Sequence, residues 1–265
     1  MTTPHLAILA AVATSGVGAV MGVLWGIEIA TGNEIFIEGG EGSHPATMVV
    51  GFLIPVSMGL TEWGLRYGRV PLATRWGKVQ VALPFFGGLS LMLGLLTGIL
   101  PLVMISLPFE ILGTVVYIAR MWPEIRSTKW LQDSHERFLG LAMLALPIDV
   151  GYLVYLISNY ADDFDLAPVH LLLAMDHLMF IGVVTNPILA LLTLNTRDRR
   201  NVWPWANTLI FAGVNIGIAG FVLGLTLDEA ALKQSFTPIL GAGLLLAVAT
   251  FMRRLQSKGD VAEVA

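Results

Sequence analysis

The stretch GSHPATMVVGFLIPVSMGL, residues 42–60, places a titratable ring, His44, at the start of a run that is otherwise apolar enough to enter a membrane. The stretch PVHLLLAMDHLMFIGVV, residues 168–184, repeats this arrangement with His170. Ionisable groups inside a bilayer are costly, and those that occur there usually serve a function. The two histidines therefore predict a membrane protein with a functional site near the beginning of two of its helices.

The composition of the whole chain agrees with a membrane location. Of its 265 residues, 55% are hydrophobic and 13% are charged, and the charged share is about half of the usual fraction. The chain has no cysteine, which excludes disulfides, iron–sulfur clusters and covalently attached c-type haem. It contains no phosphate loop, nucleophile triad, zincin motif or nucleic-acid-binding motif. We therefore expect an integral membrane protein that has the lipid bilayer as a partner and does not bind nucleic acid.

Eight apolar segments are long enough to span or nearly span a bilayer, which predicts an all-α fold with eight transmembrane helices. Pro101, Pro108 and Glu110 interrupt the fourth segment, so we expect this helix to be the least regular. The eight segments are 6–30, 45–65, 79–100, 102–119, 138–159, 168–194, 203–226 and 236–252.

The loops between these segments alternate between basic and acidic. Positive charge stays on the cytoplasmic side of a membrane, so the alternation predicts that both termini are cytoplasmic. The expected location is the cytoplasmic (inner) membrane of a bacterium. The basic loops are 66–78, 120–137 and 197–200, followed by a tail that begins with Arg253 and Arg254. The acidic loops are 31–43 and 160–167, which contain Glu34, Glu38, Glu41, Asp162, Asp163 and Asp165.

An offset of 126 residues indicates an internal repeat. This offset places His44 on His170, and it also superposes several glycines and one phenylalanine. We interpret the chain as a single membrane domain of two parallel four-helix repeats, residues 1–130 and 131–265, related by an axis along the membrane normal. Such an axis would let the two histidines face each other across the centre of the protein.

Two imidazoles at one depth on facing helices form a ligand set for a metal cofactor. Neutral imidazole is a good ligand for haem iron, copper and zinc. The leucines, valines and methionines around His44 and His170 suit a flat apolar porphyrin. The expected cofactor is haem b, with its propionates near the non-cytoplasmic face. The alternative is that each histidine is an interfacial residue at a helix end and bonds to water.

His177 lies seven residues after His170, on the same helical face and about two turns, roughly 10 Å, deeper. Three roles are open for it: ligand of a second metal or haem, true axial ligand in place of His170, or hydrogen-bonding partner of Asp176 or a backbone carbonyl. His177 lies about as far along the chain from the cytoplasmic arginines as His44 does, which favours His177 as the ligand. The repeat favours His170 instead. We expect His44 and His170 to be the ligands.

The order of six residues in these two helices resembles that of a known family of membrane proteins. It comprises His44, Met48, Pro55 and Gly59 in the second helix, and His170 and Met175 in the sixth. The two helices resemble those that hold the low-spin haem in haem–copper oxidase subunit I and in related NnrS-type membrane proteins. The resemblance implies that His44 and His170 ligate a haem, with Met48 and Met175 beside it. The copper-site motifs of the family, His-x-x-x-Tyr and a His-His pair, are absent, so oxygen reduction at a binuclear centre is not expected.

Other ionisable residues lie within or near the apolar segments. Asp149 with Tyr152 is a candidate for a proton route or a quinone contact, as is Asp176. A neutral, hydrogen-bonded structural role is the alternative for Asp149. Glu28 and Glu62 lie close to helix ends and are expected to be interfacial.

Three functions remain open at this point. The first is a haem-b-binding membrane protein that transfers electrons or binds a diatomic gas such as NO or O2, with a redox partner or quinone. The second is a transporter or channel built from two repeats without haem, because intramembrane acids and proline-broken helices are common in transporters. The third is a quinone-linked membrane enzyme.

Overall fold

The computed structural model describes residues 1–37, 40–130, 134–161, 166–199 and 203–257. Eight helices within this part of the chain are long and apolar enough to cross a membrane, which confirms the predicted all-α membrane fold. Five of the predicted loop charges, Glu38, Asp162, Asp163, Asp165 and Arg200, lie outside the described residues.

Six of the eight spans are single α-helices, and two contain a π-helical segment. The single helices are α1 (Thr3–Thr31), α4 (Arg75–Thr97), α5 (Leu100–Ser127), α6 (Ser134–Tyr160), α9 (Ala206–Thr226) and α10 (Ala230–Gln256). The second span consists of α2 (Ser43–Ala46), the π-helix η2 (Thr47–Leu53) and α3 (Ile54–Leu65), and a 3-10 turn, η1 (Gly40–Gly42), precedes it. The sixth span consists of α7 (Val169–His177), the π-helix η4 (Leu178–Thr185) and α8 (Asn186–Asn195).

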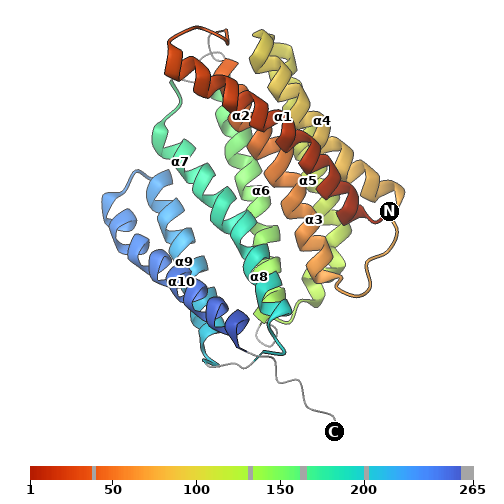
Figure 1. Cartoon of the computed structure of the whole chain (residues 1–265), viewed down its shortest axis with the longest axis vertical. Helices are drawn as coiled ribbons and strands as arrows, with labels where there is room; N and C mark the ends of the chain where they lie inside the picture. Colours follow the sequence, from red (N-terminus) through yellow and green to blue (C-terminus); the bar gives the residue numbers. More distant parts are fainter. Residues whose placement is uncertain (38–39, 131–133, 162–165, 200–202, 258–265) are drawn as a thin grey trace. The chain divides into compact units, whose positions relative to one another are not determined.

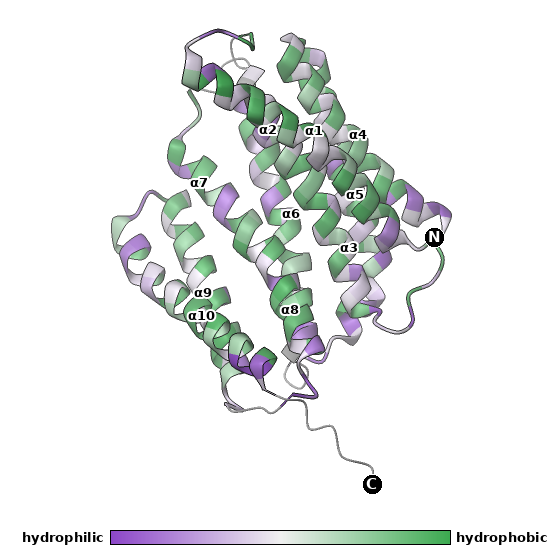
Figure 2. Ribbon diagram, in the orientation of Figure 1, coloured by the Kyte–Doolittle hydropathy of each residue, from purple (hydrophilic) through white to green (hydrophobic). Residues whose placement is uncertain are grey.

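Large apolar side chains cover the outside of these spans. On α1, for example, Leu9, Val23 and Ile29 are 54%, 64% and 69% exposed. Figure 2 shows hydrophobic residues along the lengths of the helices, with hydrophilic residues gathered mainly near helix ends and in loops. An apolar surface of this size is suited to the hydrocarbon of a bilayer and would be unfavourable in water. The chain is therefore a multi-pass membrane protein.

The fourth span differs from its prediction, because it is one continuous helix. Pro101 is the second residue of α5, where a missing N–H costs nothing, and Pro108 and Pro123 lie inside the helix. Membrane helices tolerate interior proline when neighbouring groups satisfy the freed carbonyls. The helix also runs further than expected, so Arg120 and Arg126, which were predicted in a loop, are helical.

The first of two compact units comprises Met1–Arg126 and Leu146–Val169. In this unit α1 packs against the second span through small residues. A Cβ added to Gly51 would lie 3.0 Å from Cβ of Thr14, and a Cβ added to Gly59 would lie 3.1 Å from Cβ of Ala7. Small residues let helix backbones approach closely in membranes, where packing replaces the hydrophobic effect as the force between helices.

At one end of the first unit, the N-terminus is joined to the basic loop between α3 and α4. Thr2 and Leu72 form an isolated antiparallel bridge. The amide of Ala73 donates to the carbonyl of Met1 at 3.1 Å. The N-terminus and this loop therefore lie at the same end of the unit.

The second compact unit comprises Ser127–Ala145 and the described residues from His170 onward. Here α9 and α10 form a hairpin, seen side by side in Figure 1. Glycines allow the close contact: a Cβ at Gly213 would lie 3.0 Å from Cα of Gly243. On the other side of α9, Asn186 of α8 donates through Nδ2 to Oδ1 of Asn215 at 2.8 Å. The boundaries between the units fall at the end of α5, within α6 and at the start of α7, and the four-helix repeats 1–130 and 131–265 stay a prediction.

Candidate functional site

His44 lies in the first turn of α2 and contacts α1. Its Nδ1 is 2.8 Å from the carbonyl oxygen of Gly18. A carbonyl oxygen only accepts hydrogen bonds, so Nδ1 carries the proton and donates it, which leaves the lone pair on Nε2. Histidine ligands of metals have this arrangement, because the hydrogen bond orients the ring and makes the other nitrogen a better ligand.

Glycines of α1 make room for two of the predicted residues. A Cβ at Gly22 would lie 2.7 Å from Cε1 of His44, so the ring position depends on the glycine. A Cβ at Gly18, one turn earlier, would lie 2.7 Å from Sδ of Met48. The indole of Trp25 is 6.2 Å from the imidazole of His44, measured between ring centroids. The structure thus packs His44 and Met48 of the second span side by side against one face of α1.

His177 is half-buried at the end of α7. Its Nδ1 is 2.8 Å from the carbonyl oxygen of Leu173, so this ring also donates through Nδ1 and keeps the lone pair on Nε2. The ring packs edge-on against Phe221 of α9, with 5.0 Å between centroids. Of the partners predicted for His177, the structure shows the backbone carbonyl. Met175 and Asp176, which precede it, are half-buried.

His170 is half-buried in the first turn of α7, beside the turn between α9 and α10. A hydrogen bond from Lys233, 2.8 Å from the carboxylate, holds the pKa of Asp228 below its usual value, and the nearby charge of His170 lowers this pKa further. The side chain of Asp228 is 64% exposed, so His170 lies next to an open turn.

A landmark common to the second and sixth spans allows these histidines to be compared. In both spans a π-helix ends and an α-helix with proline at its second position follows; the prolines are Pro55 and Pro187. His44 lies 11 residues before Pro55 and His177 lies 10 residues before Pro187, whereas His170 lies 17 residues before it. Measured from the prolines, His177 corresponds to His44 more closely than His170 does.

The predicted polar residues are distributed over both units. Asp149 of α6 is 1% exposed and Tyr152, one turn later, is half-buried; both belong to the first unit. Asp176 belongs to the second unit, as do His170 and His177. The pairing of His44 with a histidine of the second unit therefore stays a prediction.

A buried charge cluster in the first unit was not predicted. Glu62, expected at the membrane interface, is 1% exposed. Its Oε1 lies 2.8 Å from Nη1 of Arg66 and 2.9 Å from Nη2 of Arg120. Gln80 of α4, fully buried, is hydrogen-bonded to both Glu62 and Arg120. Two arginines, one from α5 and one from the end of α3, compensate the charge of Glu62 inside the protein, whereas its depth in the membrane stays a prediction.

Arg66 joins this cluster to Glu124 of α5, since its Nε donates to that carboxylate at 2.6 Å. Burial by itself would lower the pKa of Arg66, but the hydrogen bond to Glu124 and the charges of Glu124 and Glu62 outweigh burial and raise this pKa above its usual value. The guanidinium is therefore a permanent charge. One sequence signal pointed to the cluster: Glu62–Arg66 and Arg120–Glu124 are acid–base pairs four residues apart.

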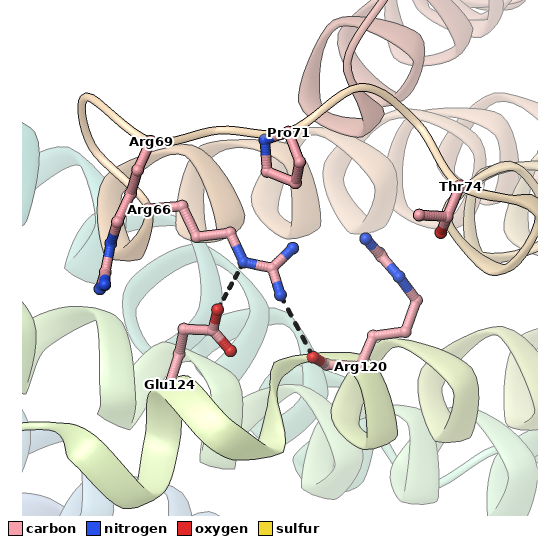
Figure 3. Close-up of a pocket in the computed structure, with 6 residues that line it drawn as sticks. All are labelled: Arg66, Arg69, Pro71, Thr74, Arg120 and Glu124. Atoms are coloured by element: carbon pink, nitrogen blue, oxygen red, sulfur yellow. Dashed lines mark hydrogen bonds and ion pairs between the residues drawn. The ribbon is translucent and has the colours of Figure 1, made fainter.

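A pocket of about 350 Å³ opens above the cluster, at the ends of α3, α4 and α5 (Figure 3). The guanidinium groups of Arg66 and Arg120 point toward one another across it, and Arg69 lies at its side. The lining residues are Arg66, Arg69, Pro71, Thr74, Arg120 and Glu124.

Glu110 is the second buried acid of this unit. It is 0% exposed in the middle of α5, and among the described residues neither of its carboxyl oxygens has a hydrogen-bond partner. It packs against Gly87 of α4, where an added Cβ would overlap with Oε1. The hydroxyl of Thr114, one turn further along α5, is buried and also has no partner within the described part of the chain. An ionisable group buried in a membrane span is a candidate functional residue.

Polar residues follow this face of α5 from Glu110 to the pocket. Their spacing of three or four residues places them on one stripe of the helix. Tyr117, 1% exposed, is hydrogen-bonded to Thr61 of α3 and continues the stripe between Glu110 and the charge cluster. The stripe consists of Ser106, Glu110, Thr114, Tyr117, Arg120 and Glu124.

Comparisons with protein-family models, with curated proteins and with solved structures find no match. In the part of the chain that the structure describes, no three histidine, aspartate or glutamate side chains gather as a metal site would require. A haem iron needs only one or two protein ligands, so the histidines are assessed one by one. The resemblance to the haem–copper oxidase family stays a prediction.

Proposed function

We propose that this chain is a haem-b-binding membrane protein that transfers electrons or binds a diatomic gas, with His44 as an axial ligand. The observation that carries the proposal is the hydrogen bond from Nδ1 of His44 to the carbonyl of Gly18, 2.8 Å long. It fixes the ring and leaves Nε2 with the lone pair that iron requires. The apolar side chains of the spans suit a porphyrin ring.

A bound haem would supply one-electron exchange, or an open iron position for a gas. The protein would contribute ligation and orientation. The carbonyl of Gly18 keeps His44 in one tautomer, and Gly22 and Gly18 leave space for the rings and chains on this face. Met48 packs beside them and helps to form an apolar surface.

A second histidine ligand, in the sixth span, stays a prediction from the sequence. The predicted repeat favours His170, whereas the position before Pro187 and the tautomer fixed by Leu173 favour His177. His170→Ala and His177→Ala separate these possibilities. The variant that removes the true ligand loses haem, and the other variant keeps it.

A reduced-minus-oxidised absorption spectrum of the purified full chain tests the proposal. Wild type should show sharp haem b bands, and His44→Ala should lose most of them. His135→Ala, a change of the same kind in the first turn of α6, is the matched control and should keep full haem content. A colourless wild-type protein, produced with ample haem, would overturn the proposal, as would full haem content in His44→Ala.

A second candidate function, proton or cation transport, is favoured by Glu110. A fully buried acid inside a membrane span, without a hydrogen-bond partner among the described residues, is typical of ion pathways. Proteoliposomes with a pH-sensitive dye inside would test it: wild type should relax an imposed proton gradient, and Glu110→Gln should not. A wild-type rate equal to that of empty liposomes would exclude this function. A quinone contact at Asp149 and Tyr152 stays a prediction from the sequence.

For the finer location, we propose a bacterial inner membrane with both termini in the cytoplasm. The support is that the N-terminus and the basic loop with Arg66 and Arg69 lie at the same end of the first unit. A reporter fused to the C-terminus that is active only in the periplasm should be silent. Strong activity of that reporter would refute this topology.

A further inference from the structure

We infer that the pocket between Arg66, Arg69 and Arg120 is a binding site for a phosphate-bearing anion, most directly the headgroup of an anionic phospholipid. The inference concerns the charge cluster and does not depend on haem. It starts from an imbalance of charge: three guanidinium groups belong to the cluster and the pocket wall, and two carboxylates, Glu62 and Glu124, compensate them. One positive charge is therefore left for a ligand.

The uncompensated charge is best assigned to Arg69. Arg66 is paired with Glu62 and Glu124, and Arg120 is paired with Glu62. Among the described residues, the partner shown for Arg69 is the carbonyl of Leu65, at 3.4 Å from Nη2. A carbonyl accepts a hydrogen bond but carries no charge, so the guanidinium of Arg69 retains its attraction for an anion.

The other two guanidinium groups are held in place before any ligand arrives. Glu62, 1% exposed, binds both groups from the protein interior, and Gln80, 0% exposed, accepts a hydrogen bond from Arg120. In Figure 3 the two groups face one another across the pocket. Fixed guanidinium forks match the oxygens of phosphate, and a rigid site loses little conformational entropy on binding.

The carboxylate of Glu124 also lines the pocket, and its charge opposes an anion. It accepts from Nε of Arg66 at 2.6 Å, so its charge is largely compensated by that contact. Thr74 adds a hydroxyl whose oxygen accepts from the amide of Gly77, which leaves its O–H directed elsewhere and available to a phosphate oxygen.

The position of the pocket indicates a lipid as the source of the phosphate. It lies at the ends of three membrane-spanning helices, where headgroups gather. Trp76 and Trp122, close in sequence to the lining residues Thr74 and Arg120, are 60% and 47% exposed. Exposed tryptophan marks the membrane–water interface, and basic side chains there attract anionic lipids.

Retention of lipid by the purified full chain tests the inference. The protein would be exchanged into detergent with equal amounts of phosphatidylglycerol and phosphatidylcholine, and bound lipid measured by native mass spectrometry. Wild type should prefer phosphatidylglycerol. Arg69→Gln should weaken this binding about tenfold or more, because it removes one charge-assisted hydrogen bond to the phosphate. Arg75→Gln, an equal charge change at an exposed residue outside the pocket, is the control and should bind as wild type does.

Inorganic phosphate serves as the second probe, with thermal unfolding in detergent as the readout. If wild type shows no lipid preference but phosphate raises its unfolding temperature, and Arg69→Gln abolishes that rise, the site takes a soluble phosphate compound and the lipid source is wrong. Equal losses in Arg69→Gln and Arg75→Gln would reduce the effect to general surface charge and overturn the site. No response to either probe would overturn it as well. Haem content is irrelevant to all of these readouts, so failure here is distinguishable from failure of the haem proposal.

Discussion

The hydroxyl of Thr14 in α1 donates to the carbonyl of Gly51 in the π-helix η2. Gly51 lies in a π-helix, where a carbonyl takes its backbone donor from five residues on, and Pro55 has no N–H that could offer the α-helical alternative. In a bilayer no water is at hand to satisfy backbone carbonyls, so donors from neighbouring helices matter. A side chain 37 residues away therefore ties α1 to the backbone of the second span.

Thr14→Val should destabilise the protein by about 0.5–1.5 kcal/mol, the net contribution of a typical hydrogen bond, and unchanged stability would contradict the role assigned to Thr14. Chemical unfolding in detergent, followed by circular dichroism, measures the change. Ser15→Ala is the matched control, because the hydroxyl of Ser15 bonds within α1 at an exposed position and its loss should have little effect.

Gly22→Ala should displace the ring of His44, because the new Cβ would lie 2.7 Å from Cε1. We expect a loss of stability of about 1–3 kcal/mol from overpacking, and a lower haem content if His44 is a ligand. Gly26→Ala, one turn along α1 with no atom within 4 Å of the new Cβ, should leave both unchanged or raise helix stability slightly. Unfolding curves measure the stability of the two variants, and absorption spectra measure their haem content. Equal stability of Gly22→Ala and Gly26→Ala would contradict the packing of Gly22 against His44.

Glu62→Gln should be among the most damaging single substitutions in the first unit. It leaves Arg66 and Arg120 without their shared buried carboxylate, and breaking a buried ion pair typically costs about 3–5 kcal/mol. The matched control is Asp198→Asn, which breaks an exposed ion pair with Arg197. The side chains of Asp198 and Arg197 are 92% and 65% exposed, so this change should cost almost nothing. Expression level and unfolding midpoint in detergent report the difference. A loss for Glu62→Gln as small as that for Asp198→Asn would show that the cluster does not stabilise the fold.

The turn between α9 and α10 should contribute stability that depends on pH. Lys233 and, to a smaller extent, His170 lower the pKa of Asp228 below its ordinary value of 3.8. A depressed pKa means that the contribution is present above the unfolded pKa and is lost as pH falls through the folded one. Asp228→Asn removes the charge while tolerating the positive φ of 51° at this position. Acid-unfolding curves of the variant and wild type should differ at neutral pH and converge at low pH; a constant gap would exclude the ion pair as the cause.

The sequence by itself determined the fold class and the number of membrane spans. Burying about 20 apolar residues in a bilayer needs no tertiary partner, so length and hydrophobicity are sufficient evidence for a span. The same holds for the positions of His44 and His170 in the first turn of their helices, which local signals determine. The continuity of α5 was missed because proline breaks helices in water more readily than it does in a packed membrane bundle.

Only the tertiary structure decided where the polar residues lie. Glu62, Gln80 and Arg120 come from three helices and meet inside the first unit. Hydropathy assigns each of them separately to a helix end or a segment, and it contains no information on which helix faces meet. The burial of Glu110, the tautomer of His44 set by Gly18, and the donor that Thr14 provides to Gly51 have the same origin. Each depends on contact between helices that are distant in sequence, and such contacts are fixed by packing.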